Sequence, residues 1–162
     1  MENFIVKKCR LDEIFQLRWE VLRNSRPREE AEFEGDFNME TYHIGVFDKE
    51  NGKVLCCASF MKNDLIFGHA FVPNGYQLRG MATRTDLQGK GLGISLLKFS
   101  EAILLRENKW LEYFWCNARI SAREFYEKNG WEVMTQPFIV NISGEEIPHV
   151  KMYKNLQQIS MK

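Results

Sequence analysis

Three glycines occupy alternate positions, 89, 91 and 93, in the stretch DLQGKGLGISL between Asp86 and Leu96. A strand-like run precedes this stretch and a leucine-rich run follows it, so the glycines lie where a helix is expected to begin. The first N–H groups of a helix have no internal partners and carry partial positive charge. Glycine lets the backbone bend until several such groups point at one anion, with no Cβ in the way.

This arrangement indicates a site for a phosphate or diphosphate, with Lys90 at its rim and Arg84 nearby. A glycine-rich loop that only turns the chain is the alternative. Two nucleotide-binding motifs do not fit. A P-loop needs Ser or Thr after its lysine, and Lys90 is followed by Gly91. A dinucleotide fingerprint needs a glycine where this sequence has Ile94.

The flanking sequence predicts the elements that position this loop. Helical and strand-like patterns give the order β-α-β-β-β-α-β-α-β-β, with a hairpin turn at Asn51-Gly52. Strands separated by helices favour parallel pairing, and hairpins favour antiparallel pairing. We therefore expect an α/β fold with a mixed sheet and helices on both faces. The expected strands are 3–10, 42–48, 54–61, 76–84, 111–117, 131–140 and 147–155, and the expected helices are 11–25, 92–109 and 121–130.

Composition narrows the class of protein. The 162 residues fit a single domain over 1–162. Lys+Arg and Asp+Glu each number 22, which predicts neither a nucleic-acid partner nor a membrane partner. The sequence shows no leader-like segment and no apolar run of membrane-spanning length, so we expect a cytoplasmic protein. The cysteines read as buried thiols and the three histidines lack zinc-binding spacing, so no metal is expected.

Several segments together resemble one family. QGKGLG (88–93) resembles the Q/R-x-x-G-x-G/A signature of the GNAT superfamily of N-acetyltransferases, which bind acetyl-CoA. NARISAREFYEKNGW (117–131) resembles their second conserved helix, and LRGMATR (78–84) matches the strand before their loop. LRWEVLR (17–23) and EEIPHVKMYK (145–154) are similar to segments of the ElaA-type branch. The sequence is therefore identified as a member of this superfamily, most similar to that branch.

The resemblance implies the GNAT, or acyl-CoA N-acyltransferase, fold, whose mixed β-sheet is centrally splayed. The pantetheine arm of CoA would enter the splay along residues 81–83, and its diphosphate would bind the amides of 88–93. A backbone N–H near Met81 would stabilise charge on the thioester oxygen. Relatives commonly place Asn seven residues before the tyrosine; here Arg119 holds that position and Asn117 precedes it, and either could contact CoA. The implied cofactor-binding residues are Met81, Ala82, Thr83, Arg84, Gln88, Gly89, Lys90, Gly91, Leu92, Gly93, Ser95, Asn117 and Arg119.

Tyr126 has two interpretations. Its place on the apolar face of the expected helix 121–130 favours packing in the core. The resemblance implies a general acid. Acyl transfer to an amine releases a thiolate, and a phenol of pKa about 10 can return a proton to a thiol of pKa about 8.5. We predict the catalytic role for Tyr126.

A general base is also expected, because a protonated amine must lose a proton before it attacks. The ElaA-like ending makes His149 the candidate, with a purely structural histidine as the alternative. The other candidates are His69, Glu34 and Asp36. The acidic stretch 28–41 is interpreted as a solvated surface, whose functional alternative is to attract a cationic amine.

The predicted function is an N-acetyltransferase that uses acetyl-CoA, or a longer acyl-CoA, and a primary amine on a small molecule or peptide. The amine would attack the thioester directly through a tetrahedral intermediate. One alternative is a non-catalytic acyl-CoA-binding or regulatory module, against which the intact Tyr126 argues. Another is an acyltransferase similar to the autoinducer synthases. The sequence does not determine the oligomeric state; a homodimer is one option, because dimers are common among GNAT proteins.

Overall fold

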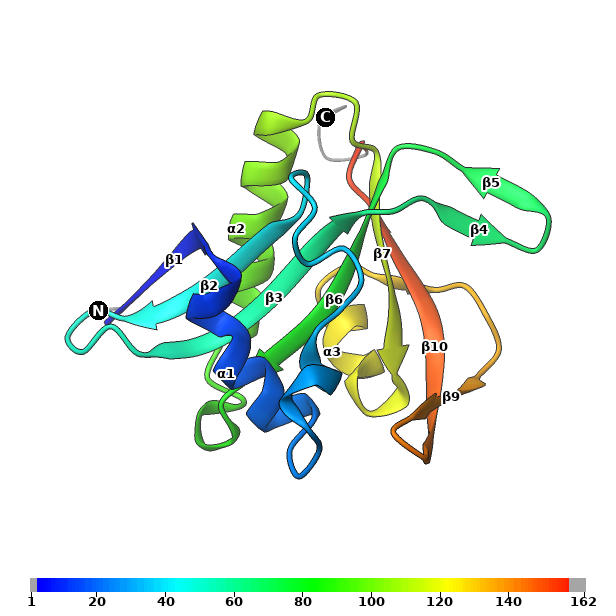
Figure 1. The fold of residues 1–162 in the computed structure, drawn as a ribbon. Coiled ribbons are helices and arrows are strands. Elements are labelled where there is room, and N and C mark those ends of the chain that lie inside the picture. Colours follow the sequence, from blue (N-terminus) through cyan, green and yellow to red (C-terminus); the bar gives the residue numbers. More distant parts are fainter. Residues whose placement is uncertain (1–2, 158–162) are drawn as a thin grey trace. The chain divides into compact units, whose positions relative to one another are not determined.

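The computed structural model describes residues 3–157 and divides into two compact units. The first unit contains residues 3–61 and Arg79–Glu107, and the second contains Lys62–Leu78 and residues 108–157. Strand β6 (Gly75–Thr83) contributes its first four residues to the second unit and the rest to the first (Figure 1).

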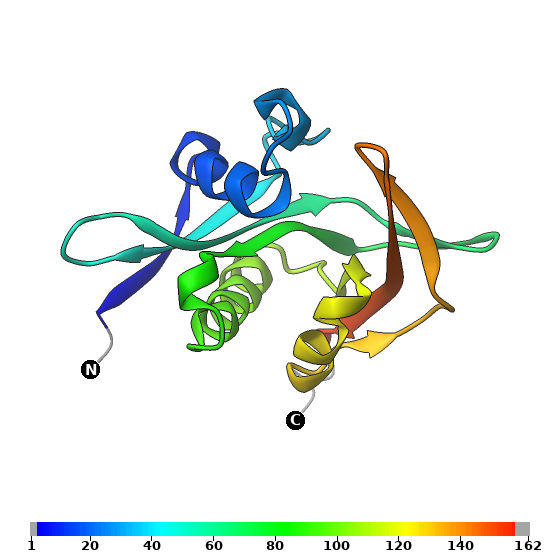
Figure 2. The ribbon, with the colours of Figure 1, turned by 90° about the horizontal axis from the view of Figure 1, so that it is seen from below.

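The first unit contains a sheet with helices on both of its faces. Strands β1 (Phe4–Cys9), β2 (Tyr42–Asp48) and β3 (Val54–Lys62) pair antiparallel in sequence order, and β6 follows β3 in the sheet. Figure 2 shows α1 (Leu11–Leu22) on one face and α2 (Leu92–Glu107) on the other. Two short 3-10 helices, η1 (Arg28–Ala31) and η2 (Thr85–Leu87), lie in the connections.

Burial explains the composition of these strands. On one side Ile14 and Leu17 of α1 pack against Phe47, Cys57 and Ala82. Because helices cover both faces, β3 is buried along nearly its whole length and its residues 54–61 are apolar except for Ser59. The β2–β3 turn has Gly52 at φ +72°, a left-handed conformation that favours glycine, and the Gly52 N–H donates to the Asp48 carbonyl at 2.9 Å.

The second unit contains a mixed sheet. Strands β6 and β7 (Tyr113–Arg119) pair in parallel, from Gly75 opposite Tyr113 to Gln77 opposite Trp115. Strand β10 (Glu145–Asn155) is antiparallel to β7. Strands β8 (Glu132–Val133) and β9 (Phe138–Ile142) both pair with β10. The 3-10 helix η3 (Ile120–Ala122) leads into α3 (Arg123–Lys128). The expected α/β class with a mixed sheet is confirmed.

One hairpin was not expected from the sequence. Strands β4 (Leu65–Phe67) and β5 (Ala70–Val72) form a separate two-stranded sheet between the expected strands 54–61 and 76–84. The Tyr113 hydroxyl accepts a hydrogen bond from the Leu65 N–H at 2.9 Å and donates one to the Val72 carbonyl. Contacts from a distant strand therefore stabilise the hairpin.

The predicted strand 131–140 is wrong as a continuous element. It divides into β8 and β9, and residues 134–137 bulge away from β10 opposite Lys151. In place of regular pairing, the Met134 N–H donates to the Lys151 carbonyl at 2.8 Å, and the Thr135 hydroxyl accepts from the Lys151 N–H at 3.0 Å. Pro137 has no N–H to offer a ladder, so the bulge lies where regular pairing would fail.

No helix within residues 3–157 combines the length and the apolar character needed to cross a membrane.

Candidate functional site

The glycine loop lies between η2 and α2 in the first unit, as the sequence predicts. Gly89 and Gly91 have φ of +79° and +84°, where residues with a Cβ are strained. A Cβ built on either glycine meets no atom within 4 Å. Glycine is therefore required for the backbone conformation and not for packing, and the space beside the loop is open to a ligand.

The loop presents the start of a helix to solvent. The Ser95 N–H donates to the Gly91 carbonyl at 3.1 Å, which is the first hydrogen bond of α2. The backbone N–H groups just before Ser95 precede that bond and have no acceptor within the helix. Gln88, Gly89, Lys90 and Gly91 are exposed. Amides at a helix start, beside the Lys90 ammonium, can bind a diphosphate.

The predicted pantetheine strand contains a left-handed residue at Gly80, with φ +64°. A Cβ there would lie 2.7 Å from the Phe33 ring and 3.0 Å from Arg18 Nε, so this position requires glycine. A left-handed glycine within a strand interrupts the regular pleat and redirects the neighbouring backbone groups. Gly80 immediately precedes Met81, and a backbone N–H near Met81 is the predicted donor to the thioester oxygen.

The side chains of the three residues after Met81 make contacts within the first unit. Ala82 is buried against α1, and the Thr83 hydroxyl lies 3.2 Å from the Cys56 sulfur. The contribution of Ala82 and Thr83 to a ligand would therefore come from the main chain. The Arg84 guanidinium donates to the Asp86 carboxylate at 2.9 Å, and both side chains are partly exposed. Arg84 would have to leave Asp86 to contact a phosphate.

An ion pair that sequence reasoning missed lies next to Gly80. Arg18 is fully buried and donates to both oxygens of Asp36, at 2.8 and 3.0 Å, and to the Ser59 hydroxyl at 2.7 Å. Asp36 is 4% exposed, so the interpretation of the acidic stretch as wholly solvated is wrong at this residue. Its carboxylate is held by Arg18, which leaves Asp36 a poor candidate for the general base. Glu34 is exposed in the same loop.

His43 completes this network. Its Nε2 lies 2.9 Å from the Asp36 carbonyl and its Nδ1 lies 2.7 Å from the Ser59 hydroxyl. Since a carbonyl only accepts, Nε2 bears the proton and Nδ1 accepts from Ser59, whose oxygen in turn accepts from Arg18. Burial lowers the pKa of His43, so the neutral ring that this arrangement requires is favoured.

Tyr126 lies on α3 in the second unit and is 6% exposed. Its ring lies 5.1 Å from the ring of Trp131, which in turn stacks on Phe114 at 6.2 Å. The core contacts expected from periodicity are therefore present. The catalytic role of Tyr126 stays a prediction.

His149 is buried on β10, directly opposite Arg119 on β7. Its Nδ1–H donates to the Ile147 carbonyl at 2.8 Å, so Nε2 holds the lone pair of the neutral ring. A base at this position would act through Nε2. Side chains alternate along β7, so His149 and Arg119 share the face opposite the one that Phe114 and Tyr126 occupy. The alternative base His69 is exposed in the β4–β5 turn.

Asn117 is paired with a residue that the sequence did not single out. The Lys151 ammonium donates to Asn117 Oδ1 at 2.9 Å and lies 4.7 Å from the centre of the Trp115 ring. Burial lowers the pKa of Lys151. In alternation with buried Val150 and Met152, a lysine reads as an ordinary outward-facing residue, so the sequence offered no signal for this contact.

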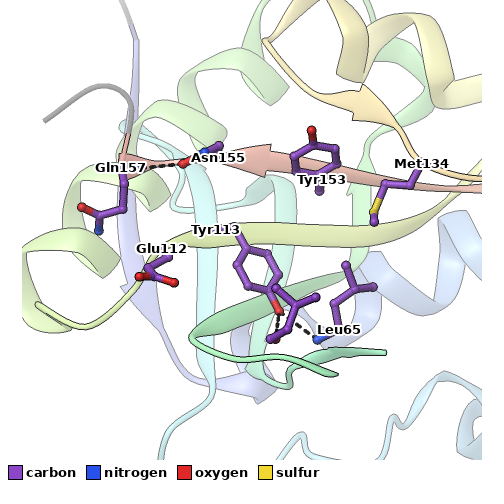
Figure 3. A pocket seen from close by; sticks show the side chains of 8 residues that line it. Leu65, Glu112, Tyr113, Met134, Tyr153, Asn155 and Gln157 are labelled. Carbon is purple, nitrogen blue, oxygen red and sulfur yellow. Dashed lines mark hydrogen bonds between the residues drawn. The ribbon is translucent and has the colours of Figure 1, made fainter. Parts of the chain in front are cut away.

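A cavity of about 420 Å³ lies at the other end of β7 (Figure 3). Tyr113 lies between Leu65 of the hairpin on one side and Tyr153 and Met134 on the other, and Val72 of the hairpin also lines the cavity. None of the predicted site residues lines this cavity. Arg119 is six residues along the strand, roughly 20 Å away at about 3.3 Å per residue.

The cysteines are unsuited to nucleophilic catalysis. Burial raises the pKa of Cys9 to about 12 and that of Cys56 to about 11, and raises those of Cys57 and Cys116 further. A nucleophilic cysteine must be a thiolate, and these thiols stay protonated near neutral pH.

Known proteins match most of the chain. The acetyltransferase (GNAT) domain family matches residues 26–156. The uncharacterized N-acetyltransferase YitI of Bacillus subtilis (strain 168) is 29% identical over 153 residues, which cover 94% of this chain and 96% of YitI. Escherichia coli ElaA has a TM-score of 0.69 at 15% identity, covering 93% of this chain and 99% of ElaA. An aminoglycoside 6'-N-acetyltransferase complexed with coenzyme A has a TM-score of 0.69 at 14% identity, covering 94% and 97%. These similarities confirm the predicted resemblance and the fold class.

Proposed function

This chain belongs to the GNAT acetyltransferase family, and on that premise we propose that it transfers an acetyl group from acetyl-CoA to a primary amine. The observation that carries the proposal is the pair of left-handed glycines, Gly89 and Gly91, which expose the first amides of α2 beside open space. Such amides suit the CoA diphosphate, with the Lys90 ammonium at the rim.

The donor would bind mainly through the backbone of the first unit. The diphosphate would accept hydrogen bonds from the amides of residues 88–93, with the Ser95 hydroxyl as a further donor. The pantetheine arm would follow the main chain of residues 81–83. The left-handed Gly80 supports a backbone N–H near Met81 as the donor to the thioester oxygen, where negative charge develops during attack.

The amine would attack the thioester carbonyl directly and form a tetrahedral intermediate. His149 would take a proton from the ammonium group through Nε2, since its Nδ1–H is engaged by a carbonyl. Tyr126 would return a proton to the departing thiolate. Burial, which is partial at Cys9, raises the pKa of all four cysteines, and this supports direct transfer without a covalent acyl-enzyme.

A non-catalytic acyl-CoA-binding module is the second candidate, favoured by the core packing of Tyr126 against Trp131. Release of CoA thiol from acetyl-CoA, measured against a panel of primary amines, separates the two candidates. Thermal-shift titration with CoA in parallel reports binding. Binding with amine-dependent thiol release supports the enzyme, whereas binding without release supports the module. A protein that neither binds CoA nor releases thiol contradicts both.

A further inference from the structure

Hydrogen-bond donors from three side chains gather on the face of the β7–β10 pair that lies opposite Tyr126. They belong to Asn117, Arg119 and Lys151, which we call the donor patch. Asn117 lies directly opposite Lys151. Arg119 lies two residues further along β7, on the same face, opposite His149. Diagonal neighbours in such a ladder are about 7–8 Å apart, so all three side chains can reach one small ligand.

Within the described residues, 3–157, the cations of the donor patch, Lys151 and Arg119, form no ion pair. The Lys151 ammonium uses one of its three N–H groups on Asn117 Oδ1, and this leaves the Asn117 Nδ2 amide as a donor. Apart from the hydrogen bond from Lys151 to Asn117, the two cations and the amide keep N–H groups that a bound anion could accept from.

Both the backbone and the side chain of Lys151 are held in place. The bulge at residues 134–137 fixes its backbone, through the Met134 N–H and the Thr135 hydroxyl. Its ammonium lies 4.7 Å from the Trp115 ring centre and 5.8 Å from that of Phe138. Burial lowers the pKa of Lys151, since no carboxylate offsets the lost hydration. A bound anion would supply the negative charge that offsets this loss of hydration.

We propose that the donor patch binds a carboxylate of the acceptor, so that the amines acetylated are those of amino acids or peptides with a free carboxylate. This inference rests on the proposed function. A carboxylate is an acceptor-only group that can take two hydrogen bonds from Arg119 and one from Lys151. A polyamine or an aminoglycoside would instead bring further positive charge to the two cations of the donor patch.

Product binding tests the donor patch independently of turnover. The probes are the N-acetyl derivatives of glycine, leucine and phenylalanine, each as the free acid and as the carboxamide, titrated calorimetrically into the protein saturated with CoA. We expect at least one acid to bind about tenfold or more tighter than its amide, the range of a charge-assisted hydrogen bond. Lys151→Met should abolish this preference and Lys151→Arg should retain part of it.

Lys154→Met is the matched control. It removes the same charge from the same strand, but Lys154 lies toward Gly130 and outside the donor patch. It should keep the preference for the acid. Equal binding of every acid and amide, or binding of none, overturns the proposal, as does an acid preference that survives Lys151→Met.

Two further measurements distinguish the carboxylate site from a site for a CoA phosphate and test the proposed function separately. Lys151→Met should leave CoA affinity unchanged, whereas a weakened CoA affinity would assign the donor patch to a CoA phosphate and overturn the proposal. Thiol release with the parent amino acids and with uncharged amines tests the proposed function. Turnover that favours polyamines overturns the carboxylate site and leaves the acetyltransferase standing. Binding of the acids without any thiol release supports the carboxylate site and contradicts the acetyltransferase.

Discussion

Replacing Gly91 with alanine tests whether the left-handed loop binds the donor. An alanine forced to φ +84° costs roughly 1–2 kcal/mol relative to a right-handed conformation. Nothing packs within 4 Å of the added Cβ, and the loop is exposed, so the chain can relax to a negative φ. CoA binding must then restore the strained conformation, and the affinity should fall by the same energy, a factor of about 5–30.

Gly52→Ala is the matched control for this prediction. Gly52 also has a positive φ, +72°, and a Cβ there also meets no atom within 4 Å, but it lies in the β2–β3 turn. This variant should lose free energy of unfolding by about 1–2 kcal/mol and bind CoA normally. Calorimetric titration of CoA into both variants, with urea unfolding of each, provides the comparison. If Gly91→Ala binds CoA as tightly as the unaltered protein, the loop does not hold the diphosphate in the conformation described.

Three other predictions follow from residues inside the two units. Tyr126→Phe keeps the ring contact with Trp131 and should lower kcat about 100-fold or more at unchanged acetyl-CoA affinity; an unchanged kcat in the thiol-release assay assigns Tyr126 to the core alone. Arg18→Met leaves the Asp36 carboxylate buried without its partner and should cost about 3–5 kcal/mol in urea unfolding, partly regained when Asp36→Asn is added; a loss under about 1 kcal/mol contradicts this. Burial lowers the pKa of His43 in the folded state, so below the unfolded value of about 6.5 the unfolded chain binds more protons than the folded chain. The free energy of unfolding should therefore decrease as the pH is lowered below about 6.5, by up to about 1.4 kcal/mol per pH unit. His43→Asn should flatten that slope, and equal slopes for both proteins would show that another group is responsible.

Local patterns in the sequence were sufficient for most elements. The leucine-rich pattern predicted a helix at 92–109, and α2 spans Leu92–Glu107. Asn51-Gly52 predicted the β2–β3 turn, which the positive φ of Gly52 confirms. The β4–β5 hairpin was missed because each strand has three residues and its support comes from Tyr113, 48 positions after Leu65. No local pattern encodes such a contact.

In the candidate site, too, local features could be predicted from the sequence and long-range contacts could not. The glycine loop is a local feature, so its position before a helix could be predicted. Asp36 was interpreted as solvated because its partner, Arg18, is 18 positions away and is brought to it by the fold. A signal was present, since Arg18 shares a helical stripe with Ile14 and Leu17, where a charge must be buried with a partner. Lys151 gave no signal, because its importance comes from a cross-strand neighbour and a bulge in the adjoining strand.

A cocrystal structure with coenzyme A tests the central claim most directly. We expect diphosphate oxygens about 3 Å from the backbone nitrogens of residues 88–93, with Gly89 and Gly91 still left-handed. A coenzyme bound elsewhere on the molecule, with these amides facing solvent, would contradict it.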